Sequence, residues 1–378
     1  MKKILSIIFV IFFAGCTSSQ VSKFTSAVLS KNPSAALTNY TKNQAIGYTN
    51  KGIAKIIQEF QKAIEKEWGE NAQEPEQKKY VKYTQNYKAM AQVDFDKGII
   101  TVQTIDTKDP NKSLQNAIVT TLLTPNDPRA VDMYSSKTIK LSGTPYLYKE
   151  VKDQTGKYIL YSWRANTFAK YLIKNKLKTT TKDINGKNQK IYTVSFNMLK
   201  DHIHIRAKKY LPSVNKYSNQ FGISKNLIFS IIQTESNFNP FAVSHIPAYG
   251  LMQIVPRSAG KDVSNYLYRK NKAPTKEYLF NSANNIKFGT AYLKIIQSKY
   301  LKGITDPISA EYCVISAYNT GSGNVLETFS KDRKKAVKII NNMKPDEVYN
   351  KLLNHLPYAE TRRYLTKVLK YKKGFVKL

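Results

Sequence analysis

The sequence predicts an α+β domain followed by an all-helical domain, and three observations lead to this fold class. The 378 residues are long enough for two domains with substantial cores. Residues 79–106 show the alternation of strands, whereas apolar residues after Asp201 recur at the spacing of amphipathic helices. A hydrophobic content of 42% excludes wholesale disorder.

The first sixteen residues have the layout of a secretory signal peptide. Two lysines precede an apolar run from Ile4 to Ala14, which is too short to span a bilayer comfortably. The ending Phe-Ala-Gly-Cys resembles the bacterial lipobox, in which the cysteine, here Cys16, is acylated and becomes the mature N-terminus. A plain signal peptide with a chance cysteine is the alternative. Thr17 stands where an Asp would favour retention in the inner membrane, so we expect a lipid anchor in the outer membrane, facing the periplasm.

Residues 17–50 are rich in Ser, Thr, Asn and Lys and are expected to form a tether. Residues 51–198 follow as the predicted α+β domain. We expect it to contain an amphipathic helix over 51–67, strands on either side of a turn at Asp96-Lys97-Gly98, a helix near Ser113–Leu123, and strands near Lys157–Trp163 and Gln189–Phe196.

Trp163 and Arg164 lie among aromatic residues in the string YSWRANTFAKYL. Such a pair can contact a sugar or an anion. A packed strand-to-helix junction is the favoured interpretation at this point.

Residues 201–378 form the predicted helical domain. Its first helix, Arg206–Phe221, is expected to end at Gly222, and Ser224 is expected to cap the next one. Later helices are predicted at about Arg257–Tyr268, Ala283–Tyr300, Pro307–Tyr318, Lys331–Asn341, Glu347–His355 and Tyr358–Lys373, with Ser282 and Asp306 as N-caps.

A net charge of +34, from 60 Lys+Arg against 26 Asp+Glu, raises the question of partners. Polyanionic cell-envelope material and nucleic acid both fit, and a compositional bias without a specific anion is the alternative. The chain carries no recognisable nucleic-acid module, so a nucleic-acid partner is not expected. The oligomeric state stays open.

No metal or cofactor is expected. His202 and His204 are two residues apart, which points them in different directions on a helix or a strand, and no ligand cluster completes a coordination set nearby. Cys313 lies in the apolar run EYCVISAY and is interpreted as a core residue rather than a nucleophile.

Glu235 is the candidate catalytic acid. It follows the apolar residues Ile231 and Ile232 at helical spacing and therefore projects from the buried side of its helix. Cleavage of a glycosidic bond requires a carboxyl group that stays protonated near neutral pH, and burial achieves this by disfavouring the charged form.

Most glycosidases also need a second carboxylate, as nucleophile or as base for water. The sequence offers no strong candidate for it. Glu360 has Arg362 and Arg363 close by in sequence, so we expect it to be ionised and to serve as a structural or sugar-binding group. One acid can suffice where the substrate supplies the nucleophile.

Four strings occur in order after Asp201, and together they carry a resemblance. They are Glu235-Ser236, Gly250-Leu251-Met252-Gln253, Ala317-Tyr318-Asn319 and Glu360-Thr361-Arg362-Arg363-Tyr364. In order and approximate spacing they resemble the soluble-lytic-transglycosylase family, with its goose-lysozyme-like fold, over roughly residues 201–373. With the lipobox and a domain ahead of it, the whole chain looks like a membrane-bound member of these enzymes.

The resemblance implies a lysozyme-like catalytic domain that cleaves the MurNAc-GlcNAc β-1,4 bond of peptidoglycan without water and leaves 1,6-anhydro-MurNAc ends. In this family the substrate's N-acetyl group attacks its own anomeric carbon while the glutamic acid, here Glu235, protonates the leaving oxygen. Glu235 then takes the proton of the sugar's C6 hydroxyl.

The resemblance also implies substrate-binding residues. Ser244, Gln253 and Tyr318 correspond to family residues that line the sugar site, and Asn319 and Glu360 lie within the matching strings. Tyr249 departs from the pattern, because a smaller residue is expected before Gly250. The alternatives are a hydrolytic muramidase on the same fold and a peptidoglycan-binding lipoprotein that does not cut.

Overall fold

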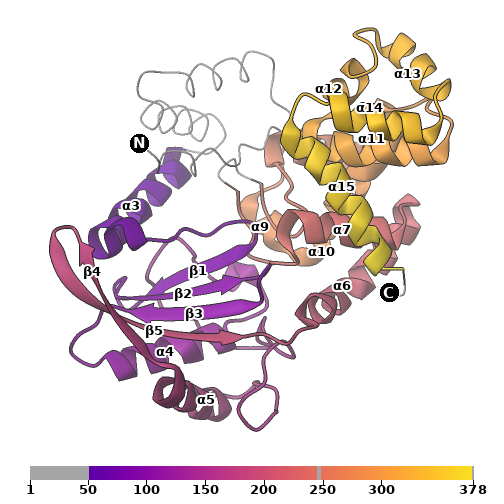
Figure 1. Ribbon diagram of the computed structural model, residues 1–378. Coiled ribbons are helices and arrows are strands. Elements are labelled where there is room, and N and C mark those ends of the chain that lie inside the picture. Colours follow the sequence, from indigo (N-terminus) through magenta and orange to yellow (C-terminus); the bar gives the residue numbers. More distant parts are fainter. Residues whose placement is uncertain (1–50, 245–247, 377–378) are drawn as a thin grey trace.

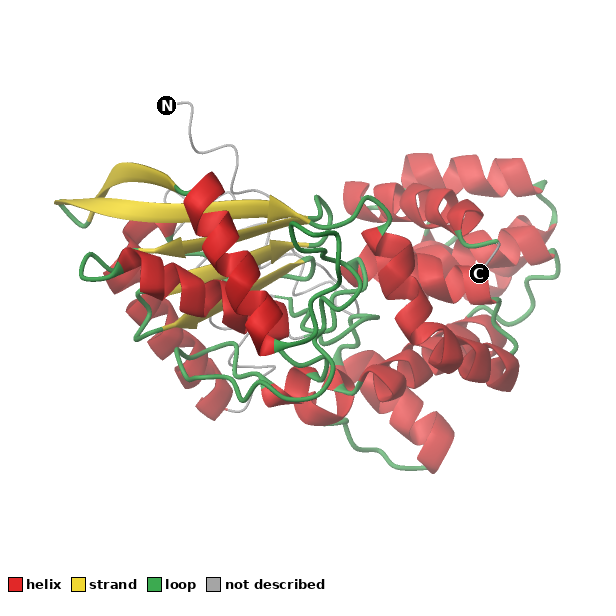
Figure 2. Cartoon of the chain, turned by 90° about the horizontal axis from the view of Figure 1, so that it is seen from below, coloured by secondary structure: helices red, strands yellow, loops and turns green. Residues whose placement is uncertain are grey.

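A computed structural model describes residues 51–244 and 248–376 of the chain. Figures 1 and 2 show a sheet with its helices on one side of the molecule and a group of helices on the other. The signal peptide, the lipobox cysteine Cys16 and the tether, all predicted for residues 1–50, lie outside the described residues. Within the described ranges, no helix combines the length and apolar character needed to cross a membrane.

The sheet has five antiparallel strands in the order β1-β2-β3-β5-β4. Alternation along the strands gives it two apolar faces. Tyr80 and Val93 belong to the core that includes α4 and α5, whereas Val81 and Met90 pack with α3 on the opposite face. The bounds are α3 (Lys51–Trp68), β1 (Lys79–Thr84), β2 (Ala89–Asp94), β3 (Ile99–Thr104), α4 (Pro110–Leu123), α5 (Ser162–Lys176), β4 (Lys178–Ile184) and β5 (Lys187–Asn197), with short 3₁₀ turns at Gly69–Asn71 and Pro128–Ala130.

The predicted strand near Lys157–Trp163 is wrong. Only an isolated bridge joins Lys152 to Tyr158, and α5 already begins at Ser162. Strand β4 has no counterpart in the prediction, because its side chains are exposed except for Ile184 and show no apolar alternation. The pairing of β4 with β5 therefore defines that strand.

The helical portion consists of α6 (His202–Phe221), α7 (Lys225–Ser236), α8 (Lys261–Tyr268), α9 (Lys276–Phe280), α10 (Ser282–Ile295), α11 (Pro307–Thr320), α12 (Ser322–Glu327), α13 (Arg333–Asn341), α14 (Pro345–His355) and α15 (Ala359–Gly374). A π-helical turn, η3 (Pro256–Gly260), directly precedes α8, and a second one, η4 (Ile296–Tyr300), directly follows α10. The short helices α9 and α12 were not predicted.

The helix caps agree with the sequence in part. Asp306 caps α11 by accepting a hydrogen bond from the amide of Ser309 at 2.7 Å, as predicted. The prediction for Ser282 is wrong, because Asn281 caps α10 through the amide of Asn284. Ser224 occupies the cap position of α7, but its side chain makes no capping hydrogen bond.

The two portions of the chain share one hydrophobic core. The rings of Tyr80 and Tyr146 lie 4.8 and 5.1 Å from the ring of Phe241, which follows α7. Beside this cluster, the buried carboxylate of Glu150 pairs with Lys209 at 2.6 Å and with Arg206 at 3.5 Å, both on α6. Because both partners come from α6, the pairing fixes that helix against the sheet portion.

The end of α7 is also tied to the sheet portion. Asn237 donates a hydrogen bond to the carbonyl of Phe95 at 2.5 Å, and Asn239 donates to the carbonyl of Gln77 at 3.0 Å. Both acceptors lie at the ends of sheet strands. The last turn of α7, which carries Glu235, is therefore positioned by both portions of the molecule.

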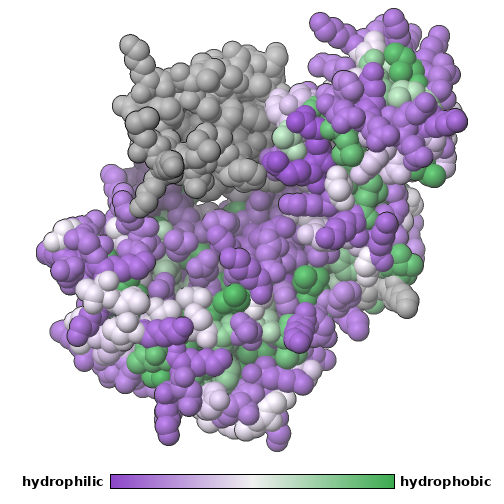
Figure 3. Space-filling model, viewed as in Figure 1, coloured by the Kyte–Doolittle hydropathy of each residue, from purple (hydrophilic) through white to green (hydrophobic). Residues whose placement is uncertain are grey.

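The face of the molecule in Figure 3 is mainly hydrophilic over both portions, with small hydrophobic patches between. This surface agrees with the charge excess of the sequence.

Candidate active site

Glu235 lies in the last turn of α7, where the chain leaves the helix sharply. Asn237 and Phe238 both have positive φ values, 49° and 62°, and Asn is among the residues that adopt this conformation most readily. The neighbouring Ser236 hydroxyl donates to the carbonyl of Leu251 at 2.7 Å, which joins the helix end to the loop that follows. Only 5% of Glu235 is exposed.

The Glu235 carboxyl group has a direct hydrogen-bond partner on α15. The Tyr364 hydroxyl on α15 donates a hydrogen bond to Glu235 Oε1 at 2.7 Å. Burial raises the pKa of Glu235 to about 8, while the Tyr364 hydrogen bond lowers it, the charge of Glu360 raises it and the charge of Lys78 lowers it. The protonated form therefore dominates at neutral pH, as a general acid requires.

The loop 249–254 passes close to α10, and Gly250 makes this approach possible. Its φ is +73°, and an added Cβ atom would meet the Asn285 side chain and lie 2.8 Å from the carbonyl of Leu279. In the absence of that atom, Asn285 accepts from the Met252 amide at 2.8 Å and donates to the Tyr249 carbonyl at 2.7 Å. From the sequence, a glycine at position 250 is expected to permit close backbone approach, and the structure confirms this.

Gln253, near the end of this loop, has a positive φ of 49° and a buried side chain. Its Nε2 donates to the carbonyls of Gly250 and Ala242 at 2.9 and 3.2 Å. Its Oε1 is buried and accepts no hydrogen bond from the residues that the structure describes. A buried acceptor without a partner is uncommon in proteins and marks a place where a ligand can donate.

Tyr318 on α11 lies beside Gln253 and Glu235. Its hydroxyl donates to the carbonyl of Met252 at 2.8 Å. Burial, followed by the neighbouring charge of Glu235, raises the pKa of Tyr318. Tyr318 and Gln253 line a small cavity of about 50 Å³, together with Ile254, Val255, Ser258, Ala259, Tyr292 and Gly321.

The remaining predicted residues surround this centre at different depths. Ser244 is half-buried, and its Oγ accepts from the amide of Ala248 at 3.1 Å. Asn319 is buried and accepts from the Thr361 hydroxyl at 2.7 Å, so it joins α11 to α15. Met252 is fully buried and belongs to the core.

At Glu360, burial and the neighbouring charges act on the carboxyl pKa in opposite directions. Burial raises the pKa of Glu360, and the charges of Arg363 and Lys367 oppose this effect. Arg362 is engaged elsewhere, because it donates to the carbonyl of Leu356. Desolvation, which sequence proximity to arginines does not report, is the larger influence on Glu360.

Two further residues act on Glu235, and neither was singled out from the sequence. Tyr364 donates a hydrogen bond to Glu235 and lies within one of the four strings, so its role could have been predicted from that string. Lys78 belongs to the sheet portion, beside Asp96 with which it pairs at 3.3 Å, and nothing in its sequence context indicates a role at Glu235.

Cys313 is buried, and burial raises the pKa of its thiol to about 12, so the interpretation as a core residue is confirmed. Across the described ranges, no three His, Cys, Asp or Glu side chains gather where they could hold a metal ion.

Comparisons with known proteins cover nearly the whole chain. The family profile of the membrane-bound lytic murein transglycosylase C N-terminal domain matches residues 46–209, and that of the transglycosylase SLT domain matches residues 212–341. Two relatives are named membrane-bound lytic murein transglycosylase C. The protein of Serratia proteamaculans is 44% identical over 89% of this chain and 93% of its own length, and that of Sodalis glossinidius is 41% identical over 99% of each.

Among solved structures, an inactive variant of the lytic transglycosylase Slt from Pseudomonas aeruginosa is 25% identical, with a TM-score of 0.33 over 43% of this chain and 23% of that one.

Proposed function

The chain belongs to the family of membrane-bound lytic murein transglycosylase C, and we propose that Glu235 is the single catalytic acid of its reaction on peptidoglycan. The reaction is the non-hydrolytic cleavage of the MurNAc-GlcNAc β-1,4 bond, which leaves a 1,6-anhydro-MurNAc end. The observation that carries the assignment is the buried carboxyl group of Glu235, with a pKa of about 8 and a hydrogen bond from Tyr364.

In the proposed first step, protonated Glu235 gives its proton to the leaving glycosidic oxygen while the substrate's N-acetyl oxygen attacks the anomeric carbon. The Tyr364 hydrogen bond stabilises the resulting carboxylate. In the second step this carboxylate removes the proton of the C6 hydroxyl, whose oxygen displaces the N-acetyl oxygen and closes the anhydro ring. A pKa near the working pH suits a group that acts as acid and then as base.

The sugar site in this proposal is built around Glu235 from Ser244, Gln253, Tyr318, Asn319 and Glu360. The buried, unpaired Oε1 of Gln253 supports it, because a substrate hydroxyl or amide can donate to that atom. We also propose that residues 51–198 and 201–378 are the two domains of the chain.

Hydrolysis is the second candidate reaction, and one observation favours it. Glu360 lies near enough to raise the pKa of Glu235, so a second carboxyl group is available to activate water. Mass spectrometry of digested sacculi separates the two reactions, since a lytic transglycosylase leaves anhydro ends and a muramidase leaves reducing ends. We expect anhydro ends from the parent protein, and no soluble products from Glu235→Gln. Reducing ends from the parent would establish hydrolysis, and cleavage by Glu235→Gln at the parental rate would remove Glu235 from the mechanism.

The membrane anchor is a separate proposal, in which Cys16 is acylated and holds the protein at the outer membrane, facing the periplasm. It is supported by the lipobox-like sequence and by relatives named membrane-bound. Membrane fractionation tests it. Cys16→Ala should move the protein to the soluble periplasmic fraction, and Thr17→Asp should shift the anchored protein to the inner membrane. A Cys16→Ala protein that stays in the membrane fraction would exclude this anchor.

A further inference from the structure

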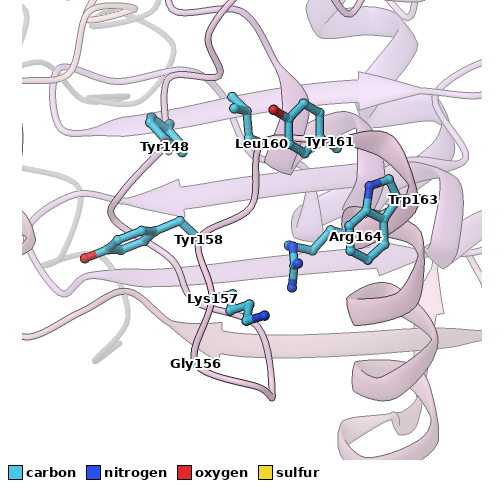
Figure 4. A pocket seen from close by; sticks show the side chains of 8 residues that line it. All are labelled: Tyr148, Gly156, Lys157, Tyr158, Leu160, Tyr161, Trp163 and Arg164. Atoms are coloured by element: carbon cyan, nitrogen blue, oxygen red, sulfur yellow. The ribbon is translucent and has the colours of Figure 1, made fainter.

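A cavity lined by aromatic residues lies in the sheet portion, apart from the cavity that Gln253 and Tyr318 line. It has a volume of about 470 Å³ and is formed by the loop before α5 and by the first turn of that helix. No residue lines both cavities. The lining consists of Tyr148, Gly156, Lys157, Tyr158, Leu160, Tyr161, Trp163 and Arg164, all visible in Figure 4.

Three aromatic side chains at this cavity are unusually exposed. Tyr158, Tyr161 and Trp163 have 40%, 60% and 61% of their surface exposed, and they account for three of the ten large exposed hydrophobic residues in the described part of the chain. Single exposed aromatics are ordinary on a protein surface, whereas a cluster around a cavity indicates a binding surface. The packed junction that was the favoured interpretation of Trp163 is therefore wrong.

The loop that carries these rings is fixed by one buried carboxylate. Asp153 Oδ1 accepts from the amide and the hydroxyl of Thr155 at 2.9 and 2.7 Å and from the amide of Lys157 at 3.0 Å. Its Oδ2 accepts from Arg164 at 2.5 Å. These bonds join the loop to the first turn of α5, so the loop is already ordered before any ligand binds.

The rings themselves are held by cations and by each other. The Arg164 guanidinium carbon lies 4.4 Å from the centre of the Trp163 ring and covers one of its faces (Figure 4). The Tyr158 ring makes an edge contact with Tyr148 at 6.2 Å and has the Lys152 ammonium group 5.2 Å from its centre. Since Arg164 covers one face and most of Trp163 is exposed, the other face of the Trp163 ring is available to a ligand.

These features match the chemistry of a peptidoglycan strand. The C–H faces of a pyranose ring are apolar and can pack against the face of an aromatic side chain. The lactyl and stem-peptide groups of peptidoglycan carry carboxylates, which Lys152 and Lys157 on the exposed loop can meet as ion pairs. The same site thus offers stacking to the sugar and positive charge to the peptide.

We propose that the cavity around Trp163 is a second binding site for peptidoglycan strands, which holds the polymer on the sheet portion while another segment is cleaved at Glu235. The proposal rests on the assigned substrate and deepens it. A strand bound at two places raises the local concentration of cleavable bonds at the active site without any new contact there.

The test is co-sedimentation with purified, insoluble sacculi at 50 mM salt, in the Glu235→Gln background so that the polymer stays intact. Trp163→Ala should weaken binding by about tenfold, the factor that corresponds to about 1.4 kcal/mol. Tyr161→Ala should weaken it in the same direction, and Lys157→Gln should weaken it by up to about fivefold, as expected for an exposed charge pair. The matched control is Tyr266→Ala, which removes a ring of similar exposure, 47%, from α8.

Sacculi stripped of stem peptides by an amidase separate the two kinds of contact. On these glycans the effect of Trp163→Ala should remain and that of Lys157→Gln should shrink. Equal binding by Trp163→Ala, Tyr161→Ala and the parent would overturn the proposal, as would an equal loss in Tyr266→Ala. Thermal unfolding of each variant identifies a folding defect. If either Trp163→Ala or Tyr161→Ala is misfolded, the binding of the other variant decides whether the proposal holds. Failure of the proposed reaction is seen separately, as an absence of anhydro ends with intact Glu235.

Discussion

Replacement of Glu235 by glutamine should change how stability depends on pH, because the folded and unfolded states bind its proton differently. Unfolded Glu235 releases its proton near the ordinary pKa of 4.5, whereas burial raises the pKa to about 8 in the folded protein. Between these values the folded state holds one proton more than the unfolded state. The free energy of unfolding of the parent protein therefore falls as pH rises through this range.

The size of this effect follows from the two pKa values. Each pKa unit corresponds to about 1.36 kcal/mol, so the range from 4.5 to about 8 gives an upper limit of about 5 kcal/mol. Glutamine carries no proton to release, and it can still accept the hydrogen bond from Tyr364. The variant should therefore gain stability relative to the parent as pH rises, with little further gain once the pH passes the folded pKa.

Urea unfolding of both proteins between pH 5 and pH 8.5 measures this difference, and contributions from all other groups cancel in it. Glu327→Gln supplies the control, since it makes the same chemical change on the exposed surface of α12. A stability difference between Glu235→Gln and the parent that stays constant across the range would refute the reasoning, because Glu235 would then release its proton at the same pH in both states.

Four further substitutions probe the same site. Glu360→Gln removes a charge that raises the pKa of Glu235, so the alkaline limb of the activity profile should move to lower pH, whereas Lys78→Met should move it to higher pH; shifts in the same direction for both variants would contradict this account. Tyr364→Phe removes a hydrogen bond to the charged form of Glu235, worth about 1.5–3 kcal/mol, so kcat on sacculi should fall about 10- to 100-fold, and an unchanged kcat would exclude the role assigned to Tyr364. Gly250→Ala should destabilise the fold by about 1–3 kcal/mol in urea unfolding, because it combines a positive φ with contacts to Asn285 and Leu279. Gly143→Ala is its control, since φ is +72° there but no atom lies within 4 Å, and equal losses in the two variants would mean that strain alone acts.

The catalytic helix could be predicted because its signals are local. The apolar residues over Leu227–Ile232 predict a buried helix, and Glu235 follows in its last turn. In the structure α7 is buried on nearly all sides, so Glu235 is buried with it. The ordered strings then located Gln253, Tyr318 and Glu360. What these residues contact could not be read in the same way, since Tyr364 and Lys78 reach Glu235 only through the packing of distant elements.

The error around Trp163 has a physical cause. Aromatic and aliphatic residues are enriched in strands, and their run predicts a strand near Lys157–Trp163. Here Tyr158, Tyr161 and Trp163 are exposed, in the surface that we propose for binding, so the enrichment does not indicate a sheet. Strand β4 shows the opposite error, a strand that the sequence did not predict. It is an exposed edge strand, and such a strand needs no apolar pattern.

The shared core and the bonds from Asn237 and Asn239 to the sheet portion also bear on how the molecule comes apart. Because Tyr80, Tyr146 and Phe241 pack together, unfolding of either portion exposes core residues of the other. A fragment that begins at Asp201 would expose these apolar residues to water, and it should therefore aggregate rather than cleave peptidoglycan.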